Sequence, residues 1–448
     1  MEHTSSGGGT PAAAPDPATI LRERQYVALV VLGALVGVPV AAIAYLFLAL
    51  VSKSQTWAFH TLPEGLGFSS APTWWPLVPL VASGFIVALS LSLLPGTGGH
   101  EPSAGLKTGG AVDPRDLPGV AVAALATLCL GAVLGPEAPL IAIGSGLGVL
   151  AVRLVKRDAP GQATLVIAAA GSFAAIATLL GSPLAGAFLL MEASGLGALL
   201  GVMLVPGLLA AGIGALIFVG LDGWTGLGTF ALAIPNLSAA TTPTIGEFGW
   251  AIVIGLVAAV LGTLVLRGAR ALQPAVAAHR MLLTPALGAA IALVAIVFEL
   301  VTDRGSGYVL FSGQTALPHL LSGASTWSAG ALLLLVLAKG LAYSLSLSGF
   351  RGGPVFPGMF LGAALGLLFS HLPGLTSLAG AAIGIGAMTV AMLGLPLVSV
   401  LLPSLLLASD AVELMPLTIV GVVTAYIASA RLRPAPAVPE PAPSGPVR

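Results

Sequence analysis

Residues 131–139 read Gly-Ala-Val-Leu-Gly-Pro-Glu-Ala-Pro and place the carboxylate of Glu137 between two long apolar runs. An unpaired carboxylate near the centre of a bilayer costs roughly 2.5–3.5 kcal/mol on insertion scales, so it is retained mainly where it faces water, a partner or a transported ion. The alternative is a carboxylate that only caps a helix, because acidic side chains favour the first helical turn. The Gly and Pro residues around Glu137 favour the functional interpretation.

The composition indicates an all-α polytopic membrane protein. Of the 448 residues, 57% are hydrophobic and only 8% are charged, and the net charge is zero. Runs of about 20 apolar residues, long enough to span the hydrocarbon core as helices, include residues 26–51, 74–94, 248–266 and 329–347. Shorter runs broken by Gly or Pro predict discontinuous helices that end inside the membrane, where protein or a water-filled cavity must receive the freed backbone groups.

Both ends of the chain differ from this pattern. Residues 1–20 and 433–448 are rich in Pro, Ala, Gly and Ser, a composition that cannot build a core, and we expect both tails to be disordered. The N-terminal segment does not have the order of a secretory signal, so we expect it to remain in the protein. The membrane domain then covers residues 21–432.

Basic residues flank the membrane domain at both ends. Arg22 and Arg24 precede the first apolar run, and Arg431 and Arg433 follow the last one. Because Lys and Arg are enriched in cytoplasmic loops, this pattern predicts that both termini are cytoplasmic and that the number of crossings is even. The single cysteine, Cys129, excludes an intramolecular disulfide and is expected to be a small packing residue.

The membrane domain repeats the same order of features in two halves, about residues 74–220 and 245–430. Each half has a Gly/Pro break, an apolar helix that contains several Gly residues, another apolar helix and a second Pro break. The paired breaks are residues 135–140 with 352–357 and residues 181–184 with 394–397. This order predicts an internal duplication, and paired interrupted helices in transporters indicate a binding site near the bilayer midplane.

The breaks also predict the charge of the ligand. Helix N-termini leave N–H groups unpaired and carry roughly half a positive charge, so several of them together form an anion site. A third break, residues 95–102, adds glycine amides and the hydroxyl of Thr97, which is expected either to bind an anion or to serve as an ordinary helix N-cap.

From about Trp74 to Ala428 these motifs resemble the CLC family of chloride channels and chloride/proton antiporters. Residues 135–139 are similar to the family's GxEGP, 96–100 to GSGxP and 353–357 to GxFxP. The resemblance implies an inverted repeat, a homodimer with one pore in each subunit, and a gating role for Glu137, which would compete with the anion and carry a proton. The anion-binding residues that it implies are Gly96, Thr97, Gly98, Gly135, Ala138, Gly353, Val355 and Phe356.

Two prolines depart from the family pattern. Pro136 and Pro354 stand where the family usually offers backbone N–H groups, which proline lacks. Because a hydrogen bond to a charged group is worth roughly 1.5–3 kcal/mol, their absence predicts weaker chloride binding or another preferred anion. The alternatives to a chloride transporter are therefore a carrier of another small anion and a scaffold that does not transport.

Other departures concern protons and the inner gate. The family's antiporters have two successive glutamates where this chain reads Glu192-Ala193. Glu192 is expected to be either a proton-pathway residue or a structural carboxylate. The family's late tyrosine has no counterpart, because Tyr426 lies within the last apolar run and is expected to pack in the core or at the interface. We expect no CBS domain in this chain.

Three further ionisable residues have two interpretations each. Lys339 and Arg351, which precede the second filter break, are expected either to raise the local positive potential or to snorkel or form structural ion pairs. His100 is either a pH-sensitive group or an incidental loop residue.

The sequence argues against an enzyme, since it contains no HExxH, no GxSxG and no pair of membrane aspartates. No cofactor, metal site or nucleic-acid partner is predicted. The expected partners are chloride or another small anion, protons, membrane lipid and a second copy of the chain. The expected location is the bacterial inner membrane.

Overall fold

The computed structural model describes residues 23–106, 108, 110–194, 200–225, 242–407 and 411–433. The tails predicted to be disordered lie outside these residues, apart from Arg433. In the described part of the chain, regular structure is helical, and eight helices are long and apolar enough to cross a membrane. The prediction of an all-α polytopic protein is therefore confirmed.

The chain packs as two compact units, and the helix α2 (Arg24–Thr56) passes from one to the other. Of the described residues, unit 1 contains 23–45, 108, 110–114, 141–194 and 200–225, and unit 2 contains 46–106, 115–140, 242–407 and 411–433. These two units are not the two repeated halves predicted from the sequence, about residues 74–220 and 245–430, and that division remains a prediction.

Unit 1 is built around the helix α7 (Gly161–Leu180), which packs against α8 (Pro183–Ser194) and α9 (Leu200–Thr225). The helix α6 (Glu137–Val155) begins in unit 2 and continues into unit 1. Small residues allow the helices to approach closely: the backbone carbonyl of Gly144 in α6 occupies the place where a side chain on Gly171 of α7 would lie.

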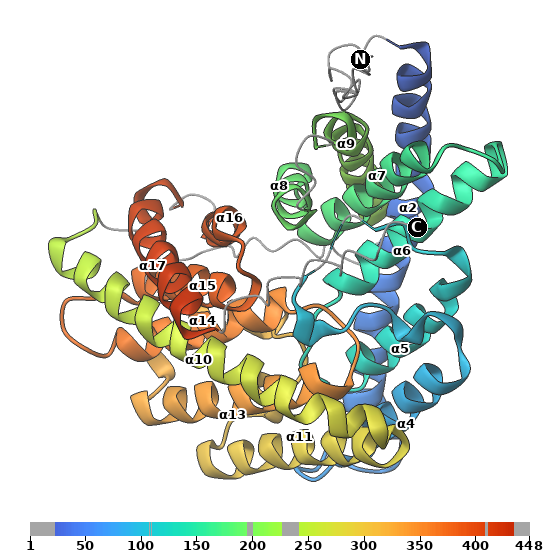
Figure 1. The fold of residues 1–448 in the computed structure, drawn as a ribbon. Coiled ribbons are helices and arrows are strands. Elements are labelled where there is room, and N and C mark those ends of the chain that lie inside the picture. The colour runs from blue at the N-terminus through green and yellow to red at the C-terminus, as the bar shows by residue number, and fades with distance from the viewer. Residues whose placement is uncertain are drawn as a thin grey trace, which may run out of the picture. The chain divides into compact units, whose positions relative to one another are not determined.

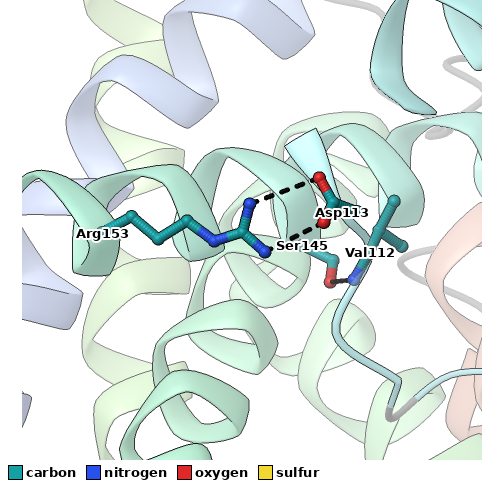
Figure 2. Close-up of polar contacts among 4 residues, drawn as sticks. All are labelled: Val112, Asp113, Ser145 and Arg153. Atoms are coloured by element: carbon teal, nitrogen blue, oxygen red, sulfur yellow. Dashed lines mark hydrogen bonds and ion pairs between the residues drawn. The ribbon is translucent and has the colours of Figure 1, made fainter. Parts of the chain in front are cut away.

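Residues 110–113 are fixed to α6 within unit 1 (Figure 2). The hydroxyl of Ser145 accepts a hydrogen bond from the Val112 N–H at 3.1 Å and donates one to the Gly110 carbonyl at 3.0 Å. Arg153 contacts both carboxylate oxygens of Asp113, at 3.3 and 3.0 Å. Because this ion pair is exposed to solvent, it orients the segment more than it stabilises the fold.

Unit 2 contains the remaining helices, and Figure 1 shows α14 and α15 side by side within it. After α2 come the π-helical turn η1 (Trp57–Thr61) and α3 (Leu62–Gly65). The longer helices are α4 (Leu77–Leu93), α5 (Leu117–Cys129), α10 (Ile245–Ala278), α11 (Arg280–Thr302), α12 (Ala316–Ser322), α13 (Ala329–Gly349), α14 (Val355–Phe369), α15 (Ser377–Leu393), α16 (Pro396–Leu407) and α17 (Ala411–Leu432). Short 3₁₀ turns are η2 (Pro95–Gly98), η3 (Pro102–Ala104), η4 (Pro114–Asp116), η6 (Ser306–Tyr308) and η7 (Ala324–Thr326).

Glycine contacts and one buried carboxylate organise unit 2. A side chain at Gly366 of α14 would clash with the carbonyl of Gly380 in α15, so these two helices touch through their backbones. Glu247 forms a capping box with Thr244 at the start of α10 and also accepts a hydrogen bond from the Thr376 hydroxyl at 3.0 Å. Thr376 is the N-cap of α15, so one carboxylate fixes the starts of two helices.

One end of unit 2 is rich in arginine. Arg267 of α10 donates a hydrogen bond to the Leu432 carbonyl at 2.6 Å, at the last residue of α17. Arg270, one turn further along α10, donates to the Ser103 carbonyl of η3 at 3.3 Å. The C-terminal end of α17 and the third break therefore lie at the same end of this unit.

Candidate anion pathway

The first filter break (residues 135–140) and the second filter break (residues 352–357), far apart in the sequence, are paired in unit 2. The Gly135 N–H donates to the Gly353 carbonyl at 2.8 Å, and the Gly353 N–H donates to the Gly135 carbonyl at 2.6 Å. This reciprocal pair is an isolated antiparallel β-bridge. It sets the beginning of α6 beside the beginning of α14, as expected if the ends of interrupted helices form one site.

Glu137 lies at this junction. It is the first residue of α6 and is 0% exposed. Its Oε1 accepts a hydrogen bond from the Phe356 N–H at 2.8 Å, and Phe356 belongs to the first turn of α14. The carboxylate therefore occupies a helix N-terminus, a position that favours negative charge.

The second carboxylate oxygen has a different environment. Among the described residues, Oε2 of Glu137 has no hydrogen-bond partner. A side chain on Gly353 or Gly135 would clash with the carboxylate, so both glycines make room for it, and Gly353 also lies close to the Ala138 backbone nitrogen. Leaving a buried polar atom unpaired costs about 1–3 kcal/mol, and more when the group is charged. In the observed position, Oε1 of Glu137 is therefore hydrogen-bonded and Oε2 is not.

Val355 begins α14 and is fully buried beside these residues. The structure therefore brings together one carboxylate and the backbone of both breaks, as the sequence predicted for Glu137, Gly135, Ala138, Gly353, Val355 and Phe356. Their roles in binding an anion remain proposals.

Two side chains of α13 that the sequence analysis missed hold the two breaks. The Tyr343 hydroxyl donates to the Pro354 carbonyl at 2.7 Å, and Pro354 is the N-cap of α14. The Ser346 hydroxyl accepts from the Val133 N–H at 2.9 Å. The signal in the sequence is spacing, because residues three apart share one face of a helix. Tyr343 and Ser346 are buried polar groups in an otherwise apolar run.

The third break has a strained backbone. Thr97 has a φ of +48°, and its neighbours Gly96 and Gly98 have φ values of +80° and +69°. Thr97 lies inside η2, whose N-cap is Leu94, so the N-cap interpretation of Thr97 is wrong. Its side chain is exposed, and no contact recorded among the described residues joins it to Glu137.

Arg351 links the third break to the second. Its Nε donates to the Thr97 carbonyl at 3.2 Å, its Nη1 donates to the Phe350 carbonyl at 3.3 Å, and its backbone N–H donates to the Thr127 hydroxyl at 3.2 Å. Arg351 is only 8% exposed and does not snorkel to water. The structure therefore shows a buried guanidinium bound to carbonyl groups, and the positive potential that we predicted there remains a prediction.

Lys339 is likewise fully buried, so the snorkelling interpretation is wrong for this residue too. Its Nζ donates to the carbonyls of Leu310 and Phe311 at 2.8 and 3.0 Å, and it lies 4.7 Å from the centre of the Phe360 ring. Phe311 has a φ of +58°, and its N–H donates to the Gly131 carbonyl at 3.2 Å. Lys339 therefore holds a strained turn that contacts the segment before Glu137.

The remaining candidates lie elsewhere or have local roles. Glu192 is half-buried in α8 of unit 1, and its proton role remains a prediction. The His100 ring is hydrogen-bonded to the Gly105 carbonyl at 3.0 Å. Tyr426 is 43% exposed on α17, and Cys129 is buried as expected of a packing residue. No group of three or more His, Cys, Asp or Glu suited to a metal ion occurs among the described residues.

Comparison with known proteins assigns this arrangement to a family. A family model described as voltage gated chloride channel matches residues 96–430, which include residues 135–140 and 352–357 and all of the third break except Pro95. The chain belongs to the voltage-gated chloride channel family. This finding confirms the CLC resemblance, and transport of anions is the activity of the family.

The individual relatives have low sequence identity to this chain, between 20% and 27%. The protein YfeO of Escherichia fergusonii, whose name assigns it provisionally to ion transport, is 27% identical over 346 residues, which cover 75% of this chain and 78% of the relative. A slow cyanobacterial Cl⁻/H⁺ antiporter has a TM-score of 0.70 at 20% identity, covering 90% of this chain and 94% of that one. A CLC-type fluoride/proton antiporter has a TM-score of 0.66 at 20% identity, with 91% and 96% covered. These solved structures share the fold, and both are named as antiporters rather than enzymes.

Proposed function

We propose that this protein moves a small anion, chloride in the first instance, along a pathway gated by Glu137. The observation that carries the proposal is the hydrogen bond from the Phe356 N–H to Oε1 of Glu137 at 2.8 Å. A backbone N–H at a helix N-terminus binds a carboxylate and a halide through the same interaction. The side chain and the transported anion therefore compete for one position.

The gating step follows from the charge of the carboxylate. While Glu137 is ionised, it fills the position at Phe356, and Oε2 remains unpaired. Protonation weakens the bond from Phe356, because hydrogen bonds to charged acceptors are the stronger ones. The neutral side chain then leaves and an anion enters. Flux is accordingly expected to rise as pH falls, and a proton carried by Glu137 would couple the two movements in an antiporter.

A second candidate substrate is fluoride. One of the structural relatives is named as a fluoride/proton antiporter. In this chain Pro136 and Pro354 provide no N–H groups, and the carbonyl of Pro354 is bound by Tyr343. The two missing donors predict weaker binding of chloride, which is why a second anion is considered. A scaffold that does not transport remains the third alternative.

We further propose a cytoplasmic C-terminus and a homodimer in the bacterial inner membrane. Arg267 and Arg270 lie with the end of α17 at one end of unit 2. Arg433, at the same end, donates to the Ala391 carbonyl. A concentration of arginine at one membrane face indicates the cytoplasmic side. The homodimer rests on family membership.

The test is anion efflux from liposomes that contain the purified protein, with proton uptake recorded at the same time. Chloride, fluoride, nitrate and bromide are compared in wild type, Glu137→Gln and Glu137→Ala, with Glu413→Gln as an exposed control on α17. Efflux coupled to protons identifies an antiporter, and efflux without proton movement identifies a channel. Unchanged pH dependence in both Glu137 variants would overturn the gating assignment. No flux of any anion would favour the scaffold.

A further inference from the structure

A groove of about 320 Å³ lies between α11 and α13 of unit 2, two helices that Figure 1 shows side by side. Its lining side chains lie between Leu293 and Phe298 on α11 and between Leu334 and Leu341 on α13, and all of them are apolar. Their spacing of three or four residues places them on one face of each helix. The volume is within the range of sites that bind small organic molecules, about 300–1,000 Å³.

The groove is open on its outer side and apolar throughout. Leu293 and Leu337 on its two rims are 58% and 57% exposed, whereas Phe298 is fully buried. Lys339 of α13 is not part of the lining, because its Nζ donates to carbonyl groups on another segment. Burying a polar group without a hydrogen-bond partner is unfavourable, so this lining excludes ions, sugars and peptide backbone. The occupant of the groove must be a hydrocarbon.

The depth of the groove corresponds to one leaflet of a bilayer. The helix α11 ends at Thr302 and α13 begins at Ala329, and both are apolar enough to cross a membrane. At about 1.5 Å per residue, the lining lies about 6–14 Å from the end of α11 and about 8–18 Å from the beginning of α13. Half of the hydrocarbon core is about 15 Å thick. The groove therefore lies at the depth of the acyl chains of a single leaflet.

Arg304 joins the two helices at the shallow end of the groove. It follows α11, and its Nη2 donates to the carbonyl and the hydroxyl of Thr326, shortly before α13 begins. Its guanidinium carbon lies 4.0 Å from the centre of the Trp327 ring, and Tyr308 packs edge-on against the same ring. Trp and Tyr are enriched where a membrane meets water. Arg304 therefore lies at the level of the lipid headgroups.

The guanidinium of Arg304 has donors left for a ligand. Within the described part of the chain, hydrogen bonds are recorded from Nη2 and none from Nε or Nη1. Neighbouring acids do not neutralise it: the described residues contain no ion pair between Asp303 and Arg304, and Glu299 accepts from the Ser306 N–H at 2.8 Å. Arginine is the side chain best suited to bind phosphate. A hydrocarbon groove that ends beneath this cation matches a phospholipid.

We propose that the groove between α11 and α13 holds one acyl chain of a membrane phospholipid and that Arg304 binds the phosphate of the same molecule. This site is separate from the anion pathway and does not depend on the role of Glu137. Only the choice of leaflet rests on the proposed function. The other end of α11 lies beside the third break, where Arg280 and Glu101 line one small cavity. With that end cytoplasmic, the lipid belongs to the extracytoplasmic leaflet.

The phosphate contact is tested by native mass spectrometry of the purified full-length protein, titrated in a maltoside detergent with dioleoyl phosphatidylglycerol. Arg304→Gln should raise the dissociation constant about tenfold, because it removes hydrogen bonds to a charged group. Arg280→Gln, the same change at the other end of α11, should bind the lipid as wild type does. Dioleoylglycerol, which has the same chains but no phosphate, should bind wild type as weakly as phosphatidylglycerol binds Arg304→Gln.

The acyl-chain contact is tested by filling the groove from either wall. Leu337→Trp and Leu293→Trp each add bulk to an exposed rim, and each should raise the dissociation constant about tenfold. The variants come from different helices, so failure of one to fold leaves the other as the test. Leu264→Trp on α10 is the control, because Leu264 is 59% exposed and lies outside the lining. Dihexanoyl phosphatidylglycerol, whose chains are too short to fill the groove, should bind weakly.

Each contrary result overturns a stated part. Wild-type affinity in Arg304→Gln, or equally tight binding of dioleoylglycerol, would refute the phosphate contact. Wild-type affinity in the tryptophan variants would refute the groove as the lipid site. If Leu337→Trp instead separates a dimer detected by light scattering, a second copy of the chain covers the groove and the lipid site is refuted. Lipid binding as expected, together with absence of anion flux, would refute only the proposed function.

Discussion

The first and second filter breaks have the same backbone arrangement, but different side chains begin the helices that follow them. Gly135 and Gly353 exchange equivalent hydrogen bonds, and each break leads directly into a helix. The first helix begins with a carboxylate, that of Glu137, whereas the second begins with two apolar residues whose side chains carry no charge. The first break therefore brings an internal anion, and the second brings the N–H group that binds it.

In the proposed function, this difference gives the molecule one gating side chain although two similar breaks are present. Symmetry supplies the bridge and two adjacent helix N-termini, and a single side chain breaks the symmetry. The helix α13 supports both breaks with separate residues, Ser346 for the first and Tyr343 for the second. Variants that affect one break and not the other therefore test whether Ser346 and Tyr343 support the two breaks separately.

The largest effect is expected from Gly353→Ala. Its Cβ would clash with Oε2 of Glu137, which lies at the end of a flexible side chain, and Gly353 does not have a positive φ. The substitution should displace the carboxylate and make anion flux independent of pH, which is the result also expected of Glu137→Ala. Efflux from liposomes between pH 5 and 8 measures this.

The matched control is Gly358→Ala in α14, the helix that follows Gly353, where the new methyl group would be 3.5 Å from the nearest atom, an ordinary contact. It should behave as wild type. In a Glu137→Ala background, Gly353→Ala should add little, because the clashing group is gone. Normal pH dependence in Gly353→Ala would mean that the carboxylate does not act from the position observed here.

A change of about tenfold is expected from Pro354→Ala. The substitution restores a backbone N–H beside the Glu137 junction, and a hydrogen bond to a charged group is worth about 1.5–3 kcal/mol. Chloride should therefore bind more tightly, as measured by calorimetry in detergent. Pro136→Ala makes the corresponding change in the first break. If neither substitution alters affinity for chloride or fluoride, the prolines are not the reason for a changed anion preference.

The sequence predicted the fold and the main parts of the site because those features are local. Apolar length, Gly/Pro breaks and the position of Glu137 are all present in short stretches of sequence. It could not predict that Gly135 pairs with Gly353, or which backbone N–H binds Glu137, because such contacts depend on how distant segments pack. Lys339 is the clearest case, since a lysine in an apolar run can snorkel, pair with an acid or bind carbonyls, and only the tertiary structure decides.

A loss of about 1–2 kcal/mol in the free energy of unfolding is expected for Tyr343→Phe and for Ser346→Ala, because each leaves a buried backbone group of one break without its partner. Thermal unfolding in detergent measures the loss, and Tyr426→Phe on the surface of α17 serves as the control. Tyr343→Phe should also weaken anion binding, since Pro354 is the N-cap of α14. Equal effects of both variants on anion affinity would contradict separate support of the two breaks.

The smallest effect, about threefold in anion affinity, is expected from Arg351→Lys. Threefold corresponds to about 0.7 kcal/mol, which lies within the net contribution of an ordinary hydrogen bond, about 0.5–1.5 kcal/mol. Lysine keeps the positive charge but cannot reproduce the planar guanidinium that reaches the carbonyls of both Thr97 and Phe350. Arg351→Gln removes the charge as well. If Arg351 acts by holding the strained Thr97 turn, the two variants should be impaired alike. If it acts through its positive potential, only Arg351→Gln should lose affinity, and the loss should shrink as salt concentration rises. The two breaks would then share an electrostatic element in addition to their hydrogen-bonded bridge.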